Sequence, residues 1–374
     1  EDLVVETPAE AALSVLFTSG STGRPKGVVM LHETYWNQLN YIERDFSLGT
    51  DGAVLWKTSL TFDLSTWEVF APLAVGARLI VPEPYVQADA AAMRDLIEAH
   101  QVTHMWIVPT QLHELLASVG EDRCRSLRHV MSAGEVLTPE LRDRFYRTFG
   151  ACLHNAYGPT EAYVVTSWQC PRELEGQQSV PIGPSVQGLR SFVLDTHLEP
   201  TNVSESGEFY ASGIGIARGY VNDPRRTAER FLPDPSGREL GARAYRTGDL
   251  ARFTVDRGFE YLGRVDRQVK VRGNRIELEA VESAIESASY VERAVVLPVS
   301  NADGSRYDRL IAFCTVGEDT PVNFAQRVRT HAAAILPEYA VPGQVECVES
   351  FPTTSSGKID RVALLKNADL RAPT

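Results

Sequence analysis

Short apolar runs of strand length alternate with stretches of helical spacing through the first two thirds of the chain. Residues 13–18, 77–81 and 127–131 have strand character, whereas residues 67–73 and 90–99 carry apolar side chains at helical intervals. Strands separated by helices pair in parallel and carry the helices on the faces of the sheet. The alternation therefore predicts an α/β fold of layered βα units with mostly parallel sheets.

The pattern changes twice further along the chain. From about residue 178, short strands separated by turn signals predict a small antiparallel β region. After Asp266, strands and helices of a compact α+β unit follow. We therefore expect a large N-terminal domain over 1–265 and a small α+β domain over 266–374.

The bulk charge and the cysteines exclude several classes of protein. A net charge of −12 disfavours binding to nucleic acid or to anionic membranes, which requires clustered Lys and Arg. The five cysteines are scattered without a C-x-x-C pair, which is typical of reduced thiols in the cytoplasm. No stretch approaches 18 apolar residues. We expect a cytoplasmic protein with no nucleic acid or membrane partner.

Residues 18–27 form a glycine-rich and hydroxyl-rich segment, Thr-Ser-Gly-Ser-Thr-Gly-Arg-Pro-Lys-Gly, directly after an apolar strand. Glycines allow backbone N–H groups to converge on an anion, hydroxyls donate to phosphate oxygens, and Lys26 adds a positive charge. Pro25 before Lys26 distinguishes the segment from a Walker A loop. A Ser/Gly turn between two strands is the alternative. The segment predicts a polyphosphate-binding loop.

Further motifs follow in a fixed order. They are 62–67 (Phe-Asp-Leu-Ser-Thr-Trp), 155–161 (Asn-Ala-Tyr-Gly-Pro-Thr-Glu), 245–249 (Tyr-Arg-Thr-Gly-Asp), 263–266 (Gly-Arg-Val-Asp), 270–277 (Lys-Val-Arg-Gly-Asn-Arg-Ile-Glu) and 355–361 (Ser-Ser-Gly-Lys-Ile-Asp-Arg). In this order they closely resemble the adenylate-forming superfamily, and specifically the adenylation domains of nonribosomal peptide synthetases. The resemblance extends over nearly the whole chain.

The resemblance implies a large N-terminal lobe, a small mobile C-terminal domain and a two-step reaction. An amino acid carboxylate attacks the α-phosphate of ATP, with Mg²⁺ present, and gives an aminoacyl-adenylate and pyrophosphate. The acyl group then passes to the phosphopantetheine thiol of a peptidyl carrier protein. Cations fit the first step, because it brings a carboxylate and a polyphosphate together.

The resemblance also implies roles for individual residues in the nucleotide site. Glu161 would bind Mg²⁺, Thr160 would contact phosphate, Tyr157 would stack on adenine, and Asp249 would accept the ribose hydroxyls. The remaining nucleotide residues would be Thr18, Ser19, Gly20, Ser21, Thr22, Gly23, Lys26, Gly134, Glu135, Asn155, Ala156 and Gly158. On local sequence alone, Asp249 and Glu161 could also be surface turn carboxylates, and Tyr157 could be a core residue.

Three further residues would connect the site to the C-terminal domain. Lys358 would bridge the α-phosphate and the substrate carboxylate, and Arg264 would approach the ribose or the α-phosphate. Asp266 would be the hinge about which the C-terminal domain swings, so that Lys358 leaves the site and residues 270–277 enter it. Without the companion motifs, Lys358 would be interpreted as part of a solvated loop.

The amino acid pocket is implied by alignment on the same motifs. Its lining would be Phe62, Asp63, Leu64, Trp67, Trp106, Met131, Ala133, Ala156, Val164 and Val165, completed by Lys358. Asp63 would pair with the α-ammonium group. The other walls are apolar and Trp106 is bulky, so we expect a small or medium neutral apolar side chain. A neutral polar side chain stays open, because an indole N–H can donate a hydrogen bond.

The chain departs from the family pattern at its start, since the phosphate loop begins at residue 18. We expect that the usual N-terminal segment is missing or is supplied as another chain. Residues 217–220 and 241–243 resemble adenylation domains that associate with an MbtH-like protein. The carrier protein is expected to come from elsewhere.

Two other functions remain possible at this stage. An acyl- or aryl-CoA ligase of the same superfamily would act on acids without an amine, which Asp63 disfavours. A non-catalytic fragment that binds a nucleotide or an amino acid would tolerate the change Lys358→Ala without effect.

Overall fold

The computed structural model describes residues 7–18, 25–84, 86, 89–120, 123–173, 179–301, 307–316, 321–353 and 359–368. The chain divides into two compact units. The first comprises Glu1–Phe17 and Gly27–Asp266, and the second comprises Thr18–Lys26 and Arg267–Thr374. The change of unit after Asp266 lies next to the boundary predicted between residues 265 and 266.

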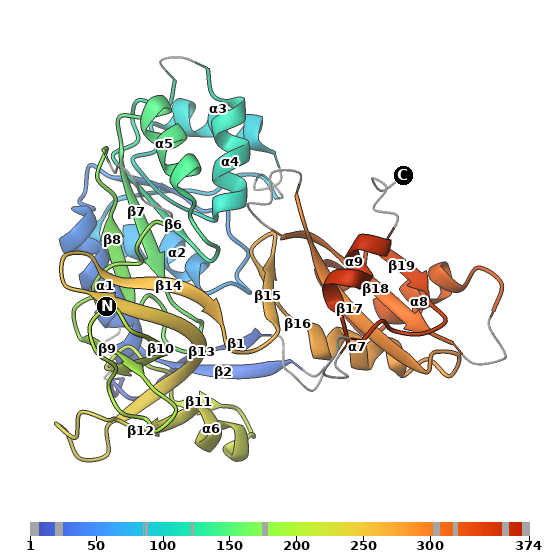
Figure 1. The fold of residues 1–374 in the computed structure, drawn as a ribbon. Coiled ribbons are helices and arrows are strands. Elements are labelled where there is room, and N and C mark those ends of the chain that lie inside the picture. Colours follow the sequence, from blue (N-terminus) through green and yellow to red (C-terminus); the bar gives the residue numbers. More distant parts are fainter. Residues whose placement is uncertain are drawn as a thin grey trace. The chain divides into compact units, whose positions relative to one another are not determined.

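A six-stranded sheet forms the centre of the first unit, with the strand order β4-β3-β5-β6-β7-β8 (Figure 1). Its pairs are parallel except for β7 with β8, which is antiparallel. The predicted, mostly parallel sheet is therefore confirmed. The strands are β3 (Ala53–Leu55), β4 (Arg78–Ile80), β5 (His104–Ile107), β6 (His129–Ala133), β7 (Cys152–Tyr157) and β8 (Thr166–Gln169).

Helices cover both faces of this sheet. Alternate residues of a strand point to opposite faces, so each central strand contributes to two hydrophobic clusters. Trp106 and Met131 belong to a hydrophobic cluster shared with α1 and α2, whereas Ile107 and Val130 belong to a cluster shared with α3, α4 and α5. Burial on both faces explains why apolar residues occupy both faces of the central strands. The helices are α1 (His32–Phe46), α2 (Leu64–Val75), α3 (Ala90–His100), α4 (Pro109–Ser118) and α5 (Pro139–Thr148).

The predicted small β region is also confirmed. Strands β9, β10, β12, β13 and β14 form an antiparallel sheet in which β13 pairs with β10, β12 and β14. A separate sheet has the order β1-β2-β11. The elements are β1 (Ala12–Thr18), β2 (Lys26–Leu31), β9 (Leu189–Leu194), β10 (Ser206–Gly213), β11 (Gly219–Tyr220), α6 (Pro224–Arg230), β12 (Phe231–Pro233), β13 (Arg243–Thr254) and β14 (Gly258–Arg264).

The second unit has a mixed sheet with the order β16-β15-β18-β17, and β19 pairs with β18. One hydrophobic cluster joins this sheet to α7 and α8, and another joins it to α9. This is the α+β architecture predicted for the C-terminal domain, and its mobility stays a prediction. The elements are β15 (Gln268–Val271), β16 (Asn274–Glu277), α7 (Leu278–Glu286), β17 (Arg293–Ser300), β18 (Tyr307–Thr315), α8 (Phe324–Ala333), η2 (Glu338–Ala340), β19 (Gln344–Cys347) and α9 (Arg361–Asn367).

In the part of the chain that the structure describes, no helix combines the length and the apolar character needed to cross a membrane.

Three histidines lie side by side near the amino ends of β5, β6 and β7. The rings of His104 and His129 stack at a centroid distance of 5.3 Å, and Nδ1 of His129 lies 3.1 Å from Nε2 of His154. Nε2 of His104 lies 2.8 Å from the carbonyl oxygen of Phe46, which can only accept, so this nitrogen carries a proton. Burial lowers the pKa of His104 and of His154 to about 4, and it also lowers the pKa of His129.

Neutral histidines in the folded state make stability depend on pH. Each folded-state pKa lies below the unfolded value of about 6.5, so the stabilisation is complete above pH 6.5 and is lost as the pH falls towards 4. His104 and His154 each contribute on the order of 3 kcal/mol to this pH-dependent part of the free energy of unfolding. We predict that the urea midpoint of the first unit falls steeply between pH 6.5 and pH 4.5. Tryptophan fluorescence follows this unit, because all five tryptophans lie between residues 36 and 168.

The matched variants are His154→Gln in the buried row and His197→Gln at an exposed position. The first should flatten the dependence of the midpoint on pH, and the second should leave it unchanged. An equal slope in all three proteins would contradict the assignment of neutral buried histidines.

Candidate active site

The residues predicted to line the amino acid pocket meet at the carboxyl ends of the parallel strands. Trp106 pairs in register with Met131, and Ala133 pairs with Ala156. Ala133 is the last residue of its strand, and Trp106 and Ala156 are next to last in theirs. Met131 lies two residues before the end of its strand. Ligands of open α/β sheets bind at this edge. The strand register therefore brings together residues that lie far apart in the sequence.

The other predicted lining residues join the same place. Trp67 on α2 packs edge-to-face on Trp106, with ring centroids 6.2 Å apart. Phe62 is half-buried in the turn before α2, and its carbonyl accepts a hydrogen bond from the Ser65 hydroxyl. One hydrophobic cluster contains Trp67, Trp106, Met131, Ala133, Ala156, Val164 and Val165, with Leu64 packed against it.

Asp63 begins the helix α2 beside this cluster. Its Oδ1 accepts a hydrogen bond of 2.8 Å from the backbone N–H of Leu64. The hydroxyls of Thr66 and Tyr163 lie 3.2 Å apart, so the first turn of α2 is tied to the segment that carries Val164. Tyr163 has a φ of 50° and burial raises its pKa, so its phenol stays neutral. The sequence analysis missed Thr66 and Tyr163, because no local pattern indicates their contact.

The two tryptophans of the cluster have unsatisfied donors. Nε1 of Trp67 and Nε1 of Trp106 are buried and have no hydrogen-bond partner among the described residues. Their side chains are almost fully inaccessible, at 0% and 1% exposure. Buried donors without a partner are uncommon and cost free energy. The cluster consists of apolar side chains, yet the two indole N–H groups in it are available as hydrogen-bond donors.

A buried ion pair supports the loop after β3, and the sequence analysis missed it too. Nζ of Lys57 lies 3.2 Å from Oε1 of Glu68, and both side chains are almost completely buried. Oε2 of Glu68 also accepts hydrogen bonds from the backbone N–H groups of Lys57 and Thr58. The carboxylate thus fixes the chain at the carboxyl end of β3, ahead of Asp63.

Asp249, the predicted ribose residue, is held by two side chains. Its Oδ1 accepts from Nη1 of Arg264 at 2.5 Å, and its Oδ2 accepts from the Tyr157 hydroxyl at 2.5 Å. Asp249 and Arg264 are direct cross-strand partners on β13 and β14. Burial and then the nearby Asp249 charge raise the pKa of Tyr157. A ribose that binds to Asp249 would have to replace at least one of these contacts.

Arg264 also binds the predicted hinge residue. Its Nε lies 2.6 Å and its Nη2 lies 2.9 Å from the two carboxylate oxygens of Asp266. Such bidentate pairs are geometrically specific. The structure therefore joins Tyr157, Asp249, Arg264 and Asp266 in one polar chain, and the hinge role of Asp266 stays a prediction.

Glu161, the predicted Mg²⁺ ligand, is completely buried. One carboxylate oxygen accepts a hydrogen bond of 2.8 Å from the Tyr220 hydroxyl. Thr160, next to it, is half-buried. Among the described residues, no group of three His, Cys, Asp or Glu side chains could hold a metal ion. A single carboxylate fits Mg²⁺, which proteins commonly bind through one or two carboxylates together with substrate phosphates.

The residues predicted around adenine make structural contacts. Glu135 follows Gly134 directly, and its Oε2 accepts two hydrogen bonds from Thr110. One comes from the Thr110 backbone N–H at 2.9 Å and the other from the Thr110 hydroxyl at 2.7 Å. Nδ2 of Asn155 donates to the carbonyl of Pro181 at 2.8 Å. These contacts tie the loop after β6 to α4 and tie β7 to the segment that follows β8. They leave the predicted nucleotide roles untested.

Part of the predicted site lies outside the described residues, namely Ser19, Gly20, Ser21, Thr22, Gly23 and Lys358. Two residues that flank the loop are described. The hydroxyl of Thr18 is buried without a hydrogen-bond partner among the described residues, and Lys26 at the start of β2 is largely buried. An orphaned donor at the end of β1 is compatible with a phosphate oxygen as its partner.

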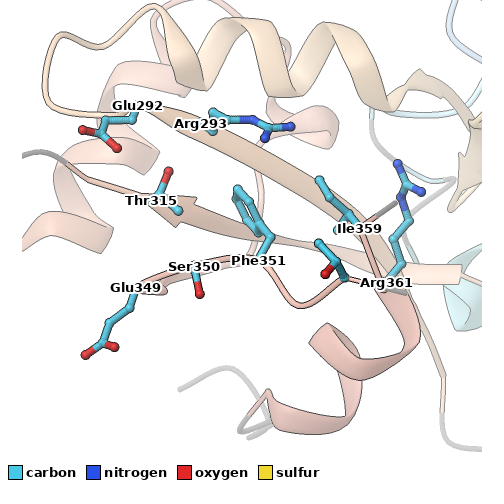
Figure 2. Close-up of a pocket in the computed structure, with 9 residues that line it drawn as sticks. Glu292, Arg293, Thr315, Glu349, Ser350, Phe351, Ile359 and Arg361 are labelled. Atoms are coloured by element: carbon cyan, nitrogen blue, oxygen red, sulfur yellow. The ribbon is translucent and has the colours of Figure 1, made fainter. Parts of the chain in front are cut away.

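The second unit has a cavity of about 610 Å³ whose lining includes Arg293, Phe351 and Arg361 (Figure 2). Thr353 and Ile359, which precede and follow residues 354–358, pair in an antiparallel bridge and both line this cavity. The guanidinium of Arg293 lies 5.6 Å from the ring centroid of Phe351 in its wall. The two ends of the Lys358 segment are therefore held together.

Comparisons with known proteins agree with this arrangement. A family model described as "AMP-binding enzyme" matches residues 2–221, and one described as "AMP-binding enzyme C-terminal domain" matches residues 280–358. Tyrocidine synthase 3 from Brevibacillus parabrevis is 38% identical over 96% of this chain. The chain spans only 5% of that relative's length.

Solved structures of adenylation domains are similar to the chain, as two examples show. The Vibrio cholerae adenylation domain AlmE, in complex with glycyl-adenosine-5'-phosphate, is 26% identical with a TM-score of 0.85, over 96% of this chain and 66% of AlmE. Holo-PA1221, a nonribosomal peptide synthetase protein with adenylation and PCP domains bound to a vinylsulfonamide inhibitor, is 27% identical with a TM-score of 0.84. That match covers 99% of this chain and 63% of holo-PA1221.

The chain belongs to the AMP-binding enzyme family, and over nearly its whole length it is similar to adenylation domains, including one from a nonribosomal peptide synthetase protein.

Gly158, in the motif that leads to Glu161, offers a structural test of this turn. A Cβ atom at Gly158 would lie 1.4 Å from the backbone oxygen of Tyr163, so no side chain fits without a shift of the main chain. We predict that Gly158→Ala lowers the free energy of unfolding by at least about 2 kcal/mol. Urea denaturation measures this loss.

Gly150→Ala is the matched control, because a Cβ atom there meets nothing within 4 Å. Its effect should stay within about 0.5 kcal/mol. Similar losses in the two variants would contradict the close approach of Gly158 and Tyr163.

Proposed function

We propose that this chain activates an L-α-amino acid with ATP, and that the acyl group is then passed to a carrier-protein thiol. In the first step, a carboxylate oxygen of the amino acid attacks the α-phosphorus of ATP. The bond from that phosphorus to the bridging oxygen breaks, and pyrophosphate leaves. The products are an aminoacyl-adenylate and pyrophosphate.

The observation that carries the proposal is the place of Asp63. Its carboxylate stands at the start of α2, beside a cluster that includes residues from the carboxyl ends of three parallel strands. A single anionic group next to an apolar wall suits a ligand with one ammonium group and a neutral side chain. Fatty and aryl acids lack the ammonium group, so Asp63 favours an amino acid over the substrates of acyl- or aryl-CoA ligases.

The nucleotide would occupy the polar residues already described. Asp249 would accept ribose hydroxyls after the release of Tyr157 or Arg264, and the freed guanidinium of Arg264 would stabilise the phosphate charge. Thr18 would donate to a phosphate oxygen. Glu161 would hold Mg²⁺, which when bound neutralises charge on the polyphosphate. Lys358 would contact the α-phosphate and the carboxylate.

The side chain of the substrate is expected to be small or medium and neutral. Trp67, Trp106 and Met131 fill much of the space along the sheet, which disfavours a large side chain. Apart from Asp63 and Lys358, none of the predicted lining residues carries a charge. The unpartnered indole N–H groups of Trp67 and Trp106 keep a neutral side chain with an acceptor oxygen within the expected range.

The proposed acceptor is the phosphopantetheine thiol of a peptidyl carrier protein. The adenylation and PCP domains in holo-PA1221 support this choice. An MbtH-like protein is a further proposed partner, on the basis of residues 217–220 and 241–243.

The experiment that tests the proposal is amino-acid-dependent exchange of labelled pyrophosphate into ATP, screened over the common amino acids. We expect exchange with one or a few small or medium neutral amino acids. Exchange with fatty or aryl acids alone would support the CoA ligase instead. Exchange with no acid, in a protein that still binds ATP, would support the non-catalytic fragment.

A charge-specific prediction concerns Asp63. Asn caps a helix as well as Asp does, so Asp63→Asn keeps the hydrogen bond to Leu64 and removes only the negative charge. We predict a loss of at least about 100-fold in kcat/KM for the amino acid, as expected for a buried charge pair. The urea midpoint should not change.

Asp89→Asn is the control, because Asp89 also stands at the N-cap of a helix, α3, where its Oδ1 accepts from the N–H groups of Ala91 and Ala92. It should keep full exchange activity. If Asp63→Asn retained wild-type kcat/KM, Asp63 would not bind the ammonium group.

A further inference from the structure

The motif at residues 217–220, which the proposed function uses only as a surface for an MbtH-like protein, also contacts β2 and the Glu161 carboxylate. Gly219 and Tyr220 form β11 and pair with Val29 and Val28 of β2, the strand that follows the predicted phosphate loop. The backbone N–H of Val221 extends this pairing by donating to Gly27 at 2.8 Å. Tyr220 is therefore fixed by main-chain hydrogen bonds to the strand that leaves the loop.

The local sequence holds the Tyr220 backbone from its other side as well. Its N–H donates to the hydroxyl of Thr227 at 3.0 Å, and that hydroxyl donates to the carbonyl of Asp223 at the start of α6. Gly219 has a φ of 144°, and a Cβ atom there would lie 2.5 Å from Cγ2 of Thr227. Only glycine allows this close approach, so the segment presents Tyr220 in one position.

The side chain of Tyr220 reaches the carboxylate predicted to bind Mg²⁺. Its hydroxyl donates to Oε1 of Glu161 at 2.8 Å, across 59 residues of sequence. Both residues are buried, with 0% exposure for Glu161 and 6% for Tyr220. The Ala217 N–H donates to the backbone oxygen of Glu161 at 2.8 Å, so this motif holds Glu161 by main chain and by side chain.

Tyr220 also lies against the strand that carries Asp249. Its hydroxyl is 3.5 Å from the hydroxyl of Tyr245 on β13, and Phe231 packs on both rings with centroid distances of 5.7 Å and 5.0 Å. Since Tyr220 donates its proton to Glu161, the Tyr245 hydroxyl can only act as the donor in this long contact. The phenol thus stands between the exit strand of the phosphate loop, the Glu161 carboxylate and the Asp249 strand.

We propose that Tyr220 is a positioning residue for the adenylation reaction, which orients the Glu161 carboxylate towards the divalent cation of the metal–ATP complex. The inference rests on the proposed function for the identity of the ligand. Groups that orient a metal ligand typically change metal affinity by 10- to 100-fold when they are removed. A purely structural hydrogen bond would affect stability without a specific effect on the metal.

The test uses Tyr220→Phe, which keeps the ring against Phe231 and removes only the hydroxyl. Binding of Mn²⁺ in the presence of α,β-methylene-ATP, followed by electron paramagnetic resonance, reports metal affinity without turnover. We expect affinity to fall roughly tenfold or more. In pyrophosphate exchange, the Mg²⁺ concentration for half-maximal rate should rise by a similar factor, with a smaller change in KM for the amino acid.

Tyr210→Phe is the matched control, because Tyr210 is equally buried and its hydroxyl lies 3.5 Å from Oε2 of Glu208. It should leave Mn²⁺ affinity unchanged. The double variant Tyr220→Phe/Glu161→Gln should bind Mn²⁺ no more weakly than Glu161→Gln alone, since Tyr220 acts through Glu161.

The outcomes separate this inference from the proposed function. If Tyr220→Phe binds Mn²⁺ as tightly as Tyr210→Phe while the unaltered protein catalyses exchange, the inference is wrong and the proposed function stands. If Tyr220→Phe weakens Mn²⁺ binding but the unaltered protein exchanges no amino acid, the proposed function fails and the metal-orienting role stands. If the unaltered protein neither binds Mn²⁺ with the analogue nor catalyses exchange, both are wrong.

Discussion

The parallel register of β5, β6 and β7 is the constraint on which the candidate site depends. Side chains alternate between the two faces, so one register decides which residues meet α1 and α2 and which meet α3, α4 and α5. A shift by one residue would exchange Trp106 and Met131 with Ile107 and Val130. The histidine row follows the same rule at the opposite ends of the strands, two residues before Trp106, Met131 and Ala156.

Buried charges are compensated in the same regions. Glu68 is neutralised by Lys57, Asp249 by Arg264 with the Tyr157 phenol, and Glu161 accepts from Tyr220. Removal of one partner from such a group costs more than the pair contributes, because the remaining charge stays in an apolar environment. The acidic chain therefore places its buried carboxylates beside specific donors, and most of these donors come from a different element.

Much of the fold could be predicted from periodicity. The helix predicted at 67–73 is the centre of α2, which runs from the Asp63 cap to Gly76 in the left-handed region. The strand predicted at 127–131 is β6, which begins two residues later, since Leu127 is buried in a turn and not in the sheet. A buried apolar side chain was there mistaken for a strand residue.

The site could be predicted only in part. The family resemblance put Asp63, Trp106 and Met131 into one predicted pocket, and the fold places Trp106 and Met131 side by side in register on β5 and β6. The contact of Tyr220 with Glu161 and that of Thr66 with Tyr163 join segments 59 and 97 residues apart through single hydroxyls. A single hydroxyl hydrogen bond between two elements produces no periodic pattern in the sequence, so only the three-dimensional structure reveals it.

The most direct test of the account is mass spectrometry of the products that the purified chain forms from ATP, Mg²⁺ and an equimolar mixture of amino acids. The account predicts an aminoacyl-AMP species with a small or medium neutral side chain. A product formed only after fatty or aryl acids are added, with no aminoacyl-AMP from any amino acid, would contradict it.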